Sequence, residues 1–168
     1  SLVDKREISI TTLGESEGRL PDGSTQITKF PSTSTPGKSN YLPLENVVIN
    51  EVLTHTDPPF EDAIELRNIS ANMVNIGNWW ISNSETNLKK FQISPSTTLS
   101  ARGMAVFYEG QFNPAPGAAH SFALNSAHGD KIILSKADGS GKLTGHRAIV
   151  EFGAAQNAIP LGRVKTSI

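Results

Sequence analysis

The feature of this chain that most limits its fold is a series of short extended runs with no helical pattern among them. No stretch of a dozen residues places apolar side chains at the i, i+3, i+4, i+7 spacing of an amphipathic helix. In residues 63–68, Ile64 and Leu66 would face one side while Glu65 and Arg67 face the other, the alternation of a half-buried strand. Eight or nine such runs predict an all-β sandwich or barrel.

Composition supports this fold class and argues against several functions. The 14 glycines and 10 prolines suit short strands joined by many turns. A formal net charge of −1 provides no basic field for phosphate, so nucleic-acid binding is not expected. The absence of cysteine excludes disulfides, thiolate catalysis and zinc–thiolate sites. No apolar run approaches the ~18 residues that cross a bilayer, so membrane insertion is not expected either.

Individual strands can be predicted from the same alternation. In the run from Val47 to Val52, we expect Val47, Ile49 and Glu51 to share one face. Residues 104–109, Met-Ala-Val-Phe-Tyr-Glu, have the composition of a buried strand. The last two strands are expected at 131–135 and 146–152, joined by a hairpin whose turn contains Asp-Gly-Ser-Gly.

Residues 1–45 differ from residues 46–168 and are expected to form a strand segment and linker before a sandwich. A weak internal echo supports this division: Gly18-Arg19-Leu20 resembles Gly162-Arg163-Val164. On this interpretation residues 1–45 end a preceding repeat and complete a sheet edge of this body or of a neighbouring copy. The start of the chain has no signal peptide, and we expect one to have been removed or to lie upstream.

Several runs in order carry a resemblance to a known family. These are Ile-Asn-Glu-Val, Ile-Glu-Leu-Arg-Asn, Gly-Asn-Trp-Trp-Ile-Ser, Lys-Phe-Gln-Ile and Phe-Ala-Leu-Asn-Ser-Ala-His-Gly-Asp-Lys-Ile-Ile-Leu-Ser, within about residues 46–153. Together they resemble the lamin tail domain, in the bacterial branch found in large exported or surface proteins. The resemblance implies an immunoglobulin-like β-sandwich without catalytic residues. It also implies a binding or assembly module in an extracellular or cell-surface position.

The acidic loop between the first two strands of the body is the first candidate site. Asp57, Glu61 and Asp62 surround two prolines and could supply some of the six to eight oxygens that calcium needs. No Asp-x-Asp-x-Asp-Gly repeat accompanies them. Solvated charges on a strand connection are therefore the favoured interpretation, and a calcium site is the alternative.

Aromatic and histidine side chains give the other candidates. Trp79 and Trp80 are adjacent in a predicted strand, so they must face opposite ways, and we assign Trp79 to the core and Trp80 to the candidate surface. His55, near Asp57, is a weaker candidate for ligand or metal contact. No His-Glu-x-x-His or Gly-x-Ser-x-Gly motif is present, so no catalytic residue is assigned.

These observations predict a non-enzymatic module that recognises protein partners through its loops and a sheet edge, with no required cofactor. Two alternatives remain: a module that binds a cell-surface glycan through Trp80, and a calcium-stabilised adhesion repeat. Self-association through strand edges is a further expectation.

Overall fold

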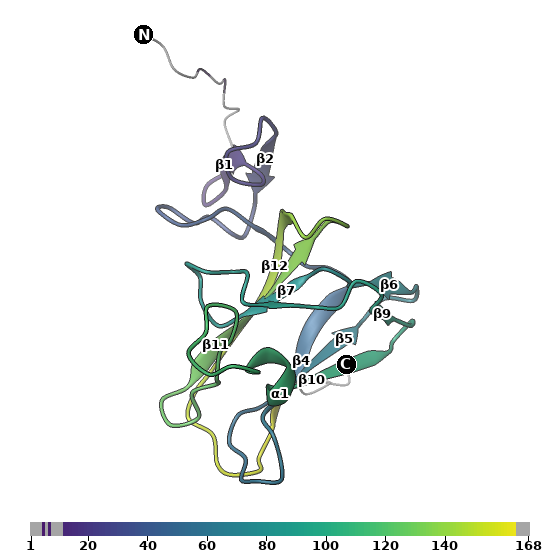
Figure 1. The fold of residues 1–168 in the computed structure, drawn as a ribbon. Coiled ribbons are helices and arrows are strands. Elements are labelled where there is room, and N and C mark those ends of the chain that lie inside the picture. Colours follow the sequence, from purple (N-terminus) through teal and green to yellow (C-terminus); the bar gives the residue numbers. More distant parts are fainter. Residues whose placement is uncertain (1–4, 6, 8–11, 164–168) are drawn as a thin grey trace, which may run out of the picture.

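The computed structural model describes residues 5, 7 and 12–163, which form two larger facing sheets and two two-stranded sheets, one of them a hairpin at one end (Figure 1). The described residues contain 13 strands and one short helix, and eight of the strands have three or more residues. The predicted all-β fold is thus confirmed. The elements are β1 (Ser16–Arg19), β2 (Ile27–Phe30), β3 (Leu42–Pro43), β4 (Val47–Leu53), β5 (Ala63–Asn68), β6 (Val74–Asn75), β7 (Trp80–Ser82), β8 (Phe91–Gln92), β9 (Thr98–Leu99), β10 (Met104–Tyr108), α1 (Glu109–Phe112), β11 (Asp130–Ala137), β12 (Leu143–Phe152) and β13 (Leu161–Gly162).

The first sheet has the strand order β10-β5-β4-β13, with every pair antiparallel. Its central pair contains a β-bulge, because Ile49 lies opposite Leu66 while Glu51 lies opposite Glu65, which leaves Asn50 as the extra residue. The bulge returns Val52 to the buried face. The predicted sharing of one face by Val47, Ile49 and Glu51 is therefore wrong for Glu51, which is exposed.

The second sheet has the strand order β3-β12-β11-β7-β8. The predicted hairpin forms its centre, but β12 begins at Leu143 instead of His146. In the turn, the Asp138 carboxylate accepts hydrogen bonds from the backbone N–H groups of Ser140 and Lys142, at 2.9 and 3.0 Å. The pKa of Asp138 is lowered chiefly by a hydrogen bond from the Ser140 hydroxyl to the carboxylate, and the two backbone bonds lower it further.

The hydrophobic core lies between the two sheets and removes apolar side chains of both from water. Because side chains alternate along a strand, Ile64 and Leu66 of the first sheet and Ile132 and Leu134 of the second point into this core. Loop residues between the strands close its ends. The buried members of the cluster are Val47, Ile49, Val52, Ile64, Leu66, Ile76, Trp79, Ile81, Ile93, Leu99, Phe107, Phe112, Phe122, Leu124, Ile132 and Leu134.

The N-terminal segment contributes a small hairpin and one short edge strand. β1 and β2 pair with each other beyond one end of the sandwich (Figure 1). β3 runs parallel to β12 at the edge of the second sheet. Leu20 is buried and lies over Gly145 of β12, where a Cβ atom would come within 2.3 Å of its Cδ1. The origin of residues 1–45 as the end of a preceding repeat stays a prediction.

Candidate functional site

Strand β10 forms one edge of the first sheet and carries a row of exposed apolar side chains. Met104, Val106 and Tyr108 are 54, 39 and 52 % exposed, whereas Phe107 points into the core. The prediction of a buried strand at residues 104–109 is wrong for three of its six residues. The reason is that nothing in the described part of the chain covers the outer face of this edge strand, so its alternation places apolar side chains in solvent.

The acidic loop lies against the end of β10. The backbone N–H of Gly110 donates a hydrogen bond to Oε2 of Glu61 at 2.9 Å, although 49 residues separate them. Phe60, next to Glu61, is 73 % exposed. A cavity of ≈ 500 Å³ lies between the loop and the strand, lined by Leu53, Pro59, Phe60, Glu61, Tyr108, Gly110 and Gln111. Phe60, Met104, Val106 and Tyr108 are called the β10 surface below.

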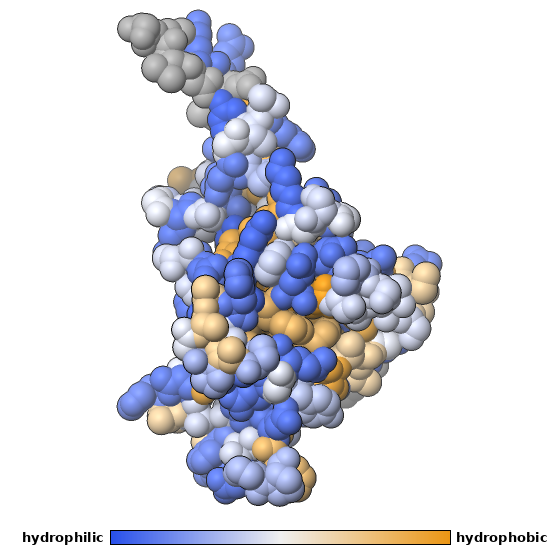
Figure 2. All heavy atoms as spheres, viewed as in Figure 1, coloured by the Kyte–Doolittle hydropathy of each residue, from blue (hydrophilic) through white to orange (hydrophobic). Residues whose placement is uncertain are grey.

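Figure 2 shows that apolar side chains reach the exterior on the side of the molecule where Figure 1 places β4 and β10. Charged residues border the exposed row, because Met104 lies opposite Arg67 and Val106 lies opposite Glu65 in the register of β10 and β5. Glu65 accepts a hydrogen bond from the Asn50 side chain at 2.6 Å. An exposed apolar patch rimmed by polar residues is typical of a protein-interaction site.

Each of the three loop carboxylates accepts a hydrogen bond from a different residue. Asp57 accepts a hydrogen bond from the Asn157 side chain, and Asp62 accepts one from the Thr56 hydroxyl at 2.9 Å. Glu61 bonds to Gly110, as described above. Within residues 12–163 and the two described residues before them, no group of three or more His, Asp or Glu residues is placed to hold a metal ion.

Asp62 is the one buried acid of this loop. Its burial raises the pKa of the carboxyl, and the hydrogen bond from Thr56 acts in the opposite direction. The charge of His55 also acts on Asp62 and lowers the pKa of its carboxyl, but less than burial raises it. The Nδ1 of His55 is 3.2 Å from the carbonyl oxygen of Ala155, and its own carbonyl accepts a hydrogen bond from the N–H of Ala158. His55 therefore joins the first sheet to the loop that leads to β13.

The two tryptophans face opposite ways, as their spacing predicts. Trp79 is buried in the core. Trp80 lies on the outer face of the second sheet, where its indole N–H donates to the carbonyl oxygen of Gly141 at 2.9 Å. The Lys89 ammonium is 5.5 Å from the ring centroid, a cation–π contact that covers one ring face. The structure does not bring Trp80 together with His55 or with the loop acids.

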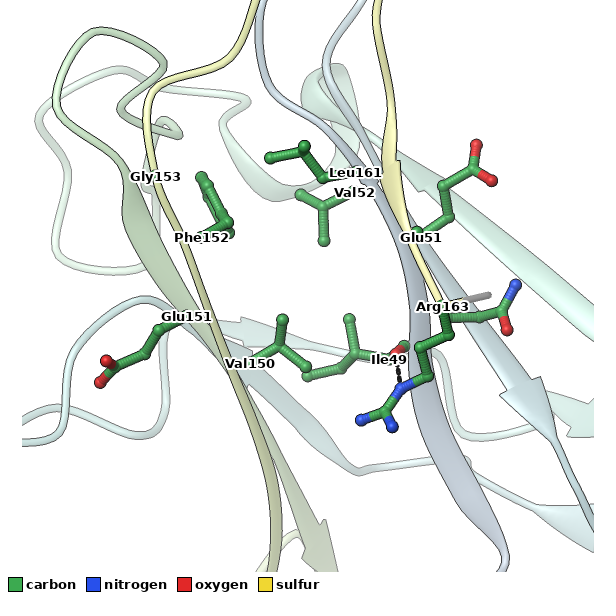
Figure 3. Close-up of a pocket in the computed structure, with 11 residues that line it drawn as sticks. Ile49, Glu51, Val52, Val150, Glu151, Phe152, Gly153, Leu161 and Arg163 are labelled. Atoms are coloured by element: carbon green, nitrogen blue, oxygen red, sulfur yellow. Dashed lines mark hydrogen bonds between the residues drawn. The ribbon is translucent and has the colours of Figure 1, made fainter. Parts of the chain in front are cut away.

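A second cavity of ≈ 370 Å³ lies between the sheets beside β13 (Figure 3). Its interior is apolar and includes Val52, Val150 and Leu161. The Nε of Arg163 donates to the carbonyl oxygen of Ile49 at 2.9 Å and fixes the end of β13 on β4. The carboxylates of Glu51 and Glu151 point away from the cavity (Figure 3). The cavity thus has no converging pair of acids of the kind used in acid–base catalysis.

Sequence reasoning missed the β10 surface. Phe60 lies within an acidic loop, so its exposed apolar ring was not considered. The sequence pattern of Met104, Val106 and Tyr108 is the same whether the outer face of the strand is covered or open. A signal was present, because this strand contains no charged residue between Gly103 and Glu109. Strand order, which decides that β10 is an edge, cannot be derived from alternation alone.

The fold defines an immunoglobulin-like β-sandwich, and the comparison with known families agrees. The lamin tail domain family matches residues 43–146, more than half of the chain, and the chain belongs to this family. No curated protein and no solved structure matches it. Membership suggests a protein-interaction domain without catalytic activity. None of the described helical residues form a helix long and apolar enough to span a membrane.

Proposed function

We propose that this lamin tail domain binds an extended segment of a partner protein along the open edge of β10. The observation that carries the proposal is the row of Met104, Val106 and Tyr108, exposed on a strand whose second edge has no strand partner among the described residues. A segment added beside β10 would gain backbone hydrogen bonds from the edge. Its side chains on the same face would pack beside the exposed row.

The composition of β10 supports this mode of binding. Natural sheet edges are often protected by lysine, proline or a bulge, and Met104–Tyr108 contains no charge, no proline and no register shift. The cavity beside Phe60 and Tyr108 gives the end of the strand a hollow that an apolar partner side chain can fill. Phe60 comes from a different part of the chain, so the surface combines a loop with a sheet edge.

We further propose that the domain acts in an exported or cell-surface bacterial protein. The support is the resemblance of its sequence runs to the bacterial branch of the family. Fractionation of cells that express the full parent protein tests this position. Recovery in the medium or on protease-accessible surface supports it, and recovery in the cytoplasm alone contradicts it.

The glycan alternative receives less support than the protein partner. One face of the Trp80 ring is covered by Lys89, and its N–H is bonded to Gly141, so little of its polar and aromatic character is available for stacking on a sugar. A glycan array probed with the wild type and with Trp80→Ala tests whether the domain binds a glycan through Trp80. Polysaccharide binding that disappears in the variant would favour the alternative.

The principal experiment is a selection of peptides from a random display library against the domain, followed by affinity measurements with two variants. Val106→Lys places a charge in the centre of the exposed row, and Leu13→Lys makes the same kind of change at an exposed apolar residue outside the β10 surface. We expect the selected peptides to lose at least tenfold in affinity for Val106→Lys and to keep it for Leu13→Lys. Equal affinity for both variants overturns the assignment.

Sedimentation of the wild type at rising concentration tests whether the partner is a second copy. A dimer that Val106→Lys dissociates would identify the extended segment as β10 of another molecule. A monomer at all concentrations leaves a foreign partner as the occupant.

A further inference from the structure

Arg147 is a buried cation whose guanidinium has no hydrogen-bond acceptor among the described residues. It lies on β12, on the face turned away from the core cluster, and its residue is 8 % exposed. Its backbone carbonyl accepts a bond from the N–H of Leu44. No hydrogen bond or ion pair joins its guanidinium to any residue that the structure describes. Buried arginines are normally paired, because removing an unpaired charge from water is costly.

The guanidinium borders a cavity between the N-terminal segment and the sandwich. The cavity has a volume of ≈ 530 Å³ and includes Thr35, Ser39 and Tyr41 on one side and Thr86 and Ile149 on the other. The Cζ of Arg147 is 5.7 Å from the centroid of the Tyr41 ring, which is a cation–π contact. Hydroxyl groups therefore share one partly open cavity with Arg147 and with the ion-paired side chains of Lys38 and Glu85.

The acids near the cavity do not neutralise Arg147 by contact. Glu85 is bonded to Lys38 and Lys131, each at 2.8 Å. Asp22 acts on Arg147 through its field, but its Oδ1 accepts a hydrogen bond from the N–H of Asn40 at 3.1 Å. The Arg147 guanidinium therefore has no contacting anion among the described groups that line the cavity.

A neighbouring side chain indicates the same incomplete pairing. Ser135 lies directly opposite Arg147 in the register of β11 and β12. Its hydroxyl oxygen is buried and has no hydrogen-bond partner among the described residues. A buried hydroxyl without a partner is unusual in a folded protein, and this one lies beside the Arg147 side chain.

We propose that the cavity binds a carboxylate, which the Arg147 guanidinium holds through two parallel N–H···O bonds. A guanidinium fork matches a planar carboxylate in geometry, and burial strengthens the charged bonds. The Ser39 hydroxyl lies in the same lining and can donate to the ligand, whereas the Thr35 hydroxyl donates to Asn40 and the Thr86 hydroxyl is bonded to Ser84. The carboxylate is supplied by an acidic protein side chain or by a uronic acid. This site is separate from the β10 surface and does not depend on its function.

Two-dimensional NMR of the whole chain tests the site, with sodium acetate as the first probe against sodium chloride at equal ionic strength. We expect a saturable shift of the Arg147 Nε–Hε signal and of the amides of Thr35 and Ser39. N-acetyl-glutamate amide and glucuronic acid then distinguish the two sources by their relative affinity. Phosphate binding without acetate binding overturns the assignment to a carboxylate.

Three variants complete the test. Arg147→Met keeps the apolar stem and should abolish the saturable shifts of the Thr35 and Ser39 amides. Arg147→Lys keeps the charge but loses the fork and should weaken acetate at least tenfold, which keeps the test decisive if the methionine variant does not fold. Arg67→Met on the opposite sheet is the matched control and should bind as the wild type does. Equal binding by wild type and Arg147→Lys, or no saturable shift in the wild type, overturns the proposal.

Discussion

The carboxylate of Glu61 accepts the backbone N–H of Gly110 at 2.9 Å and thereby fixes the acidic loop beside the end of β10. Phe60 and Tyr108 line one cavity beside this contact. The acids of the loop thus have a structural role next to an interaction surface. The acidic loop, which the sequence analysis proposed as a candidate site, thus contacts β10, which the sequence analysis predicted to be buried.

Glu61→Ala should loosen the loop without unfolding the domain. We expect a loss of at most about 1 kcal/mol in the free energy of unfolding, since one exposed hydrogen bond is removed. Amide exchange at Gly110 should accelerate, and display-selected peptides should bind more weakly. Glu45→Ala, another exposed acid, serves as control and should change neither quantity. Unchanged exchange at Gly110 would show that the contact does not hold the loop.

Gly145→Ala should disturb the docking of the N-terminal segment. The added Cβ would lie 2.3 Å from Cδ1 of Leu20, and Gly145 has a φ of +87°. The backbone strain alone is expected to cost about 1 kcal/mol. The clash with Leu20 adds to this cost in the wild type but not in a Leu20→Ala background.

A double-mutant cycle by urea unfolding separates the two effects. We expect a coupling energy of at least ~0.5 kcal/mol between Gly145 and Leu20. Additive effects would mean that the segment does not pack on β12 in solution.

Glu85→Gln should change how stability depends on acid pH. Hydrogen bonds from Lys131, and then from Lys38, lower the pKa of Glu85 to about 2, against an ordinary value of 4.5. The folded protein therefore holds this proton less tightly than the unfolded chain does. The stabilising contribution is present above pH 4.5 and disappears as the pH falls towards 2.

Urea unfolding at a series of pH values checks this prediction. Between pH 4.5 and 2 the wild type should lose more stability than Glu85→Gln, and high salt should reduce the difference. Glu45→Gln is the matched control. Parallel pH profiles of wild type and Glu85→Gln would show that the ion-pair network is not formed in solution.

Asp62→Asn should have the opposite pH signature. Burial raises the pKa of Asp62 above 3.8, so the folded protein binds this proton more tightly than the unfolded chain does. The charged form is therefore destabilising at neutral pH, and this penalty is relieved as the pH falls through the raised pKa. The amide oxygen of asparagine can still accept the hydrogen bond of Thr56.

We expect Asp62→Asn to have a Tm at pH 7 equal to or above that of the wild type, with a smaller difference at pH 4. A lower Tm at pH 7 would contradict this account of the burial. The same melts in millimolar calcium test the calcium alternative. A calcium-dependent rise of the wild-type Tm that Asp62→Asn abolishes would support a metal site in the loop.

The sequence was sufficient for the fold class because period-2 alternation determines which side chains can share a core. Ile64 and Leu66 are buried and Glu65 faces outward, as predicted. The predicted face of Glu51 was wrong because a bulge adds one residue to β4. The position of a bulge could not be predicted from the pattern of apolar residues. The family was also predicted correctly from the order of several short runs.

The candidate sites were harder to predict, because they depend on contacts between distant segments. The partnering of Asp57, Glu61 and Asp62 with Asn157, Gly110 and Thr56 could not be derived from their spacing. Arg147 lies in a strand that alternation predicts well, yet its isolation from acceptors depends on how the N-terminal segment covers β12. Side-chain direction follows from local sequence, whereas the environment that a side chain meets follows from topology.

The measurement that tests the central claim most directly is backbone amide NMR of the domain during titration with a display-selected peptide. Binding along β10 predicts the largest shifts at Met104–Tyr108 and Phe60, slower exchange of the outward amides of β10, and loss of all these changes in Val106→Lys. Shifts confined to the opposite sheet around Trp80, with β10 unaffected and Val106→Lys binding normally, would contradict the account.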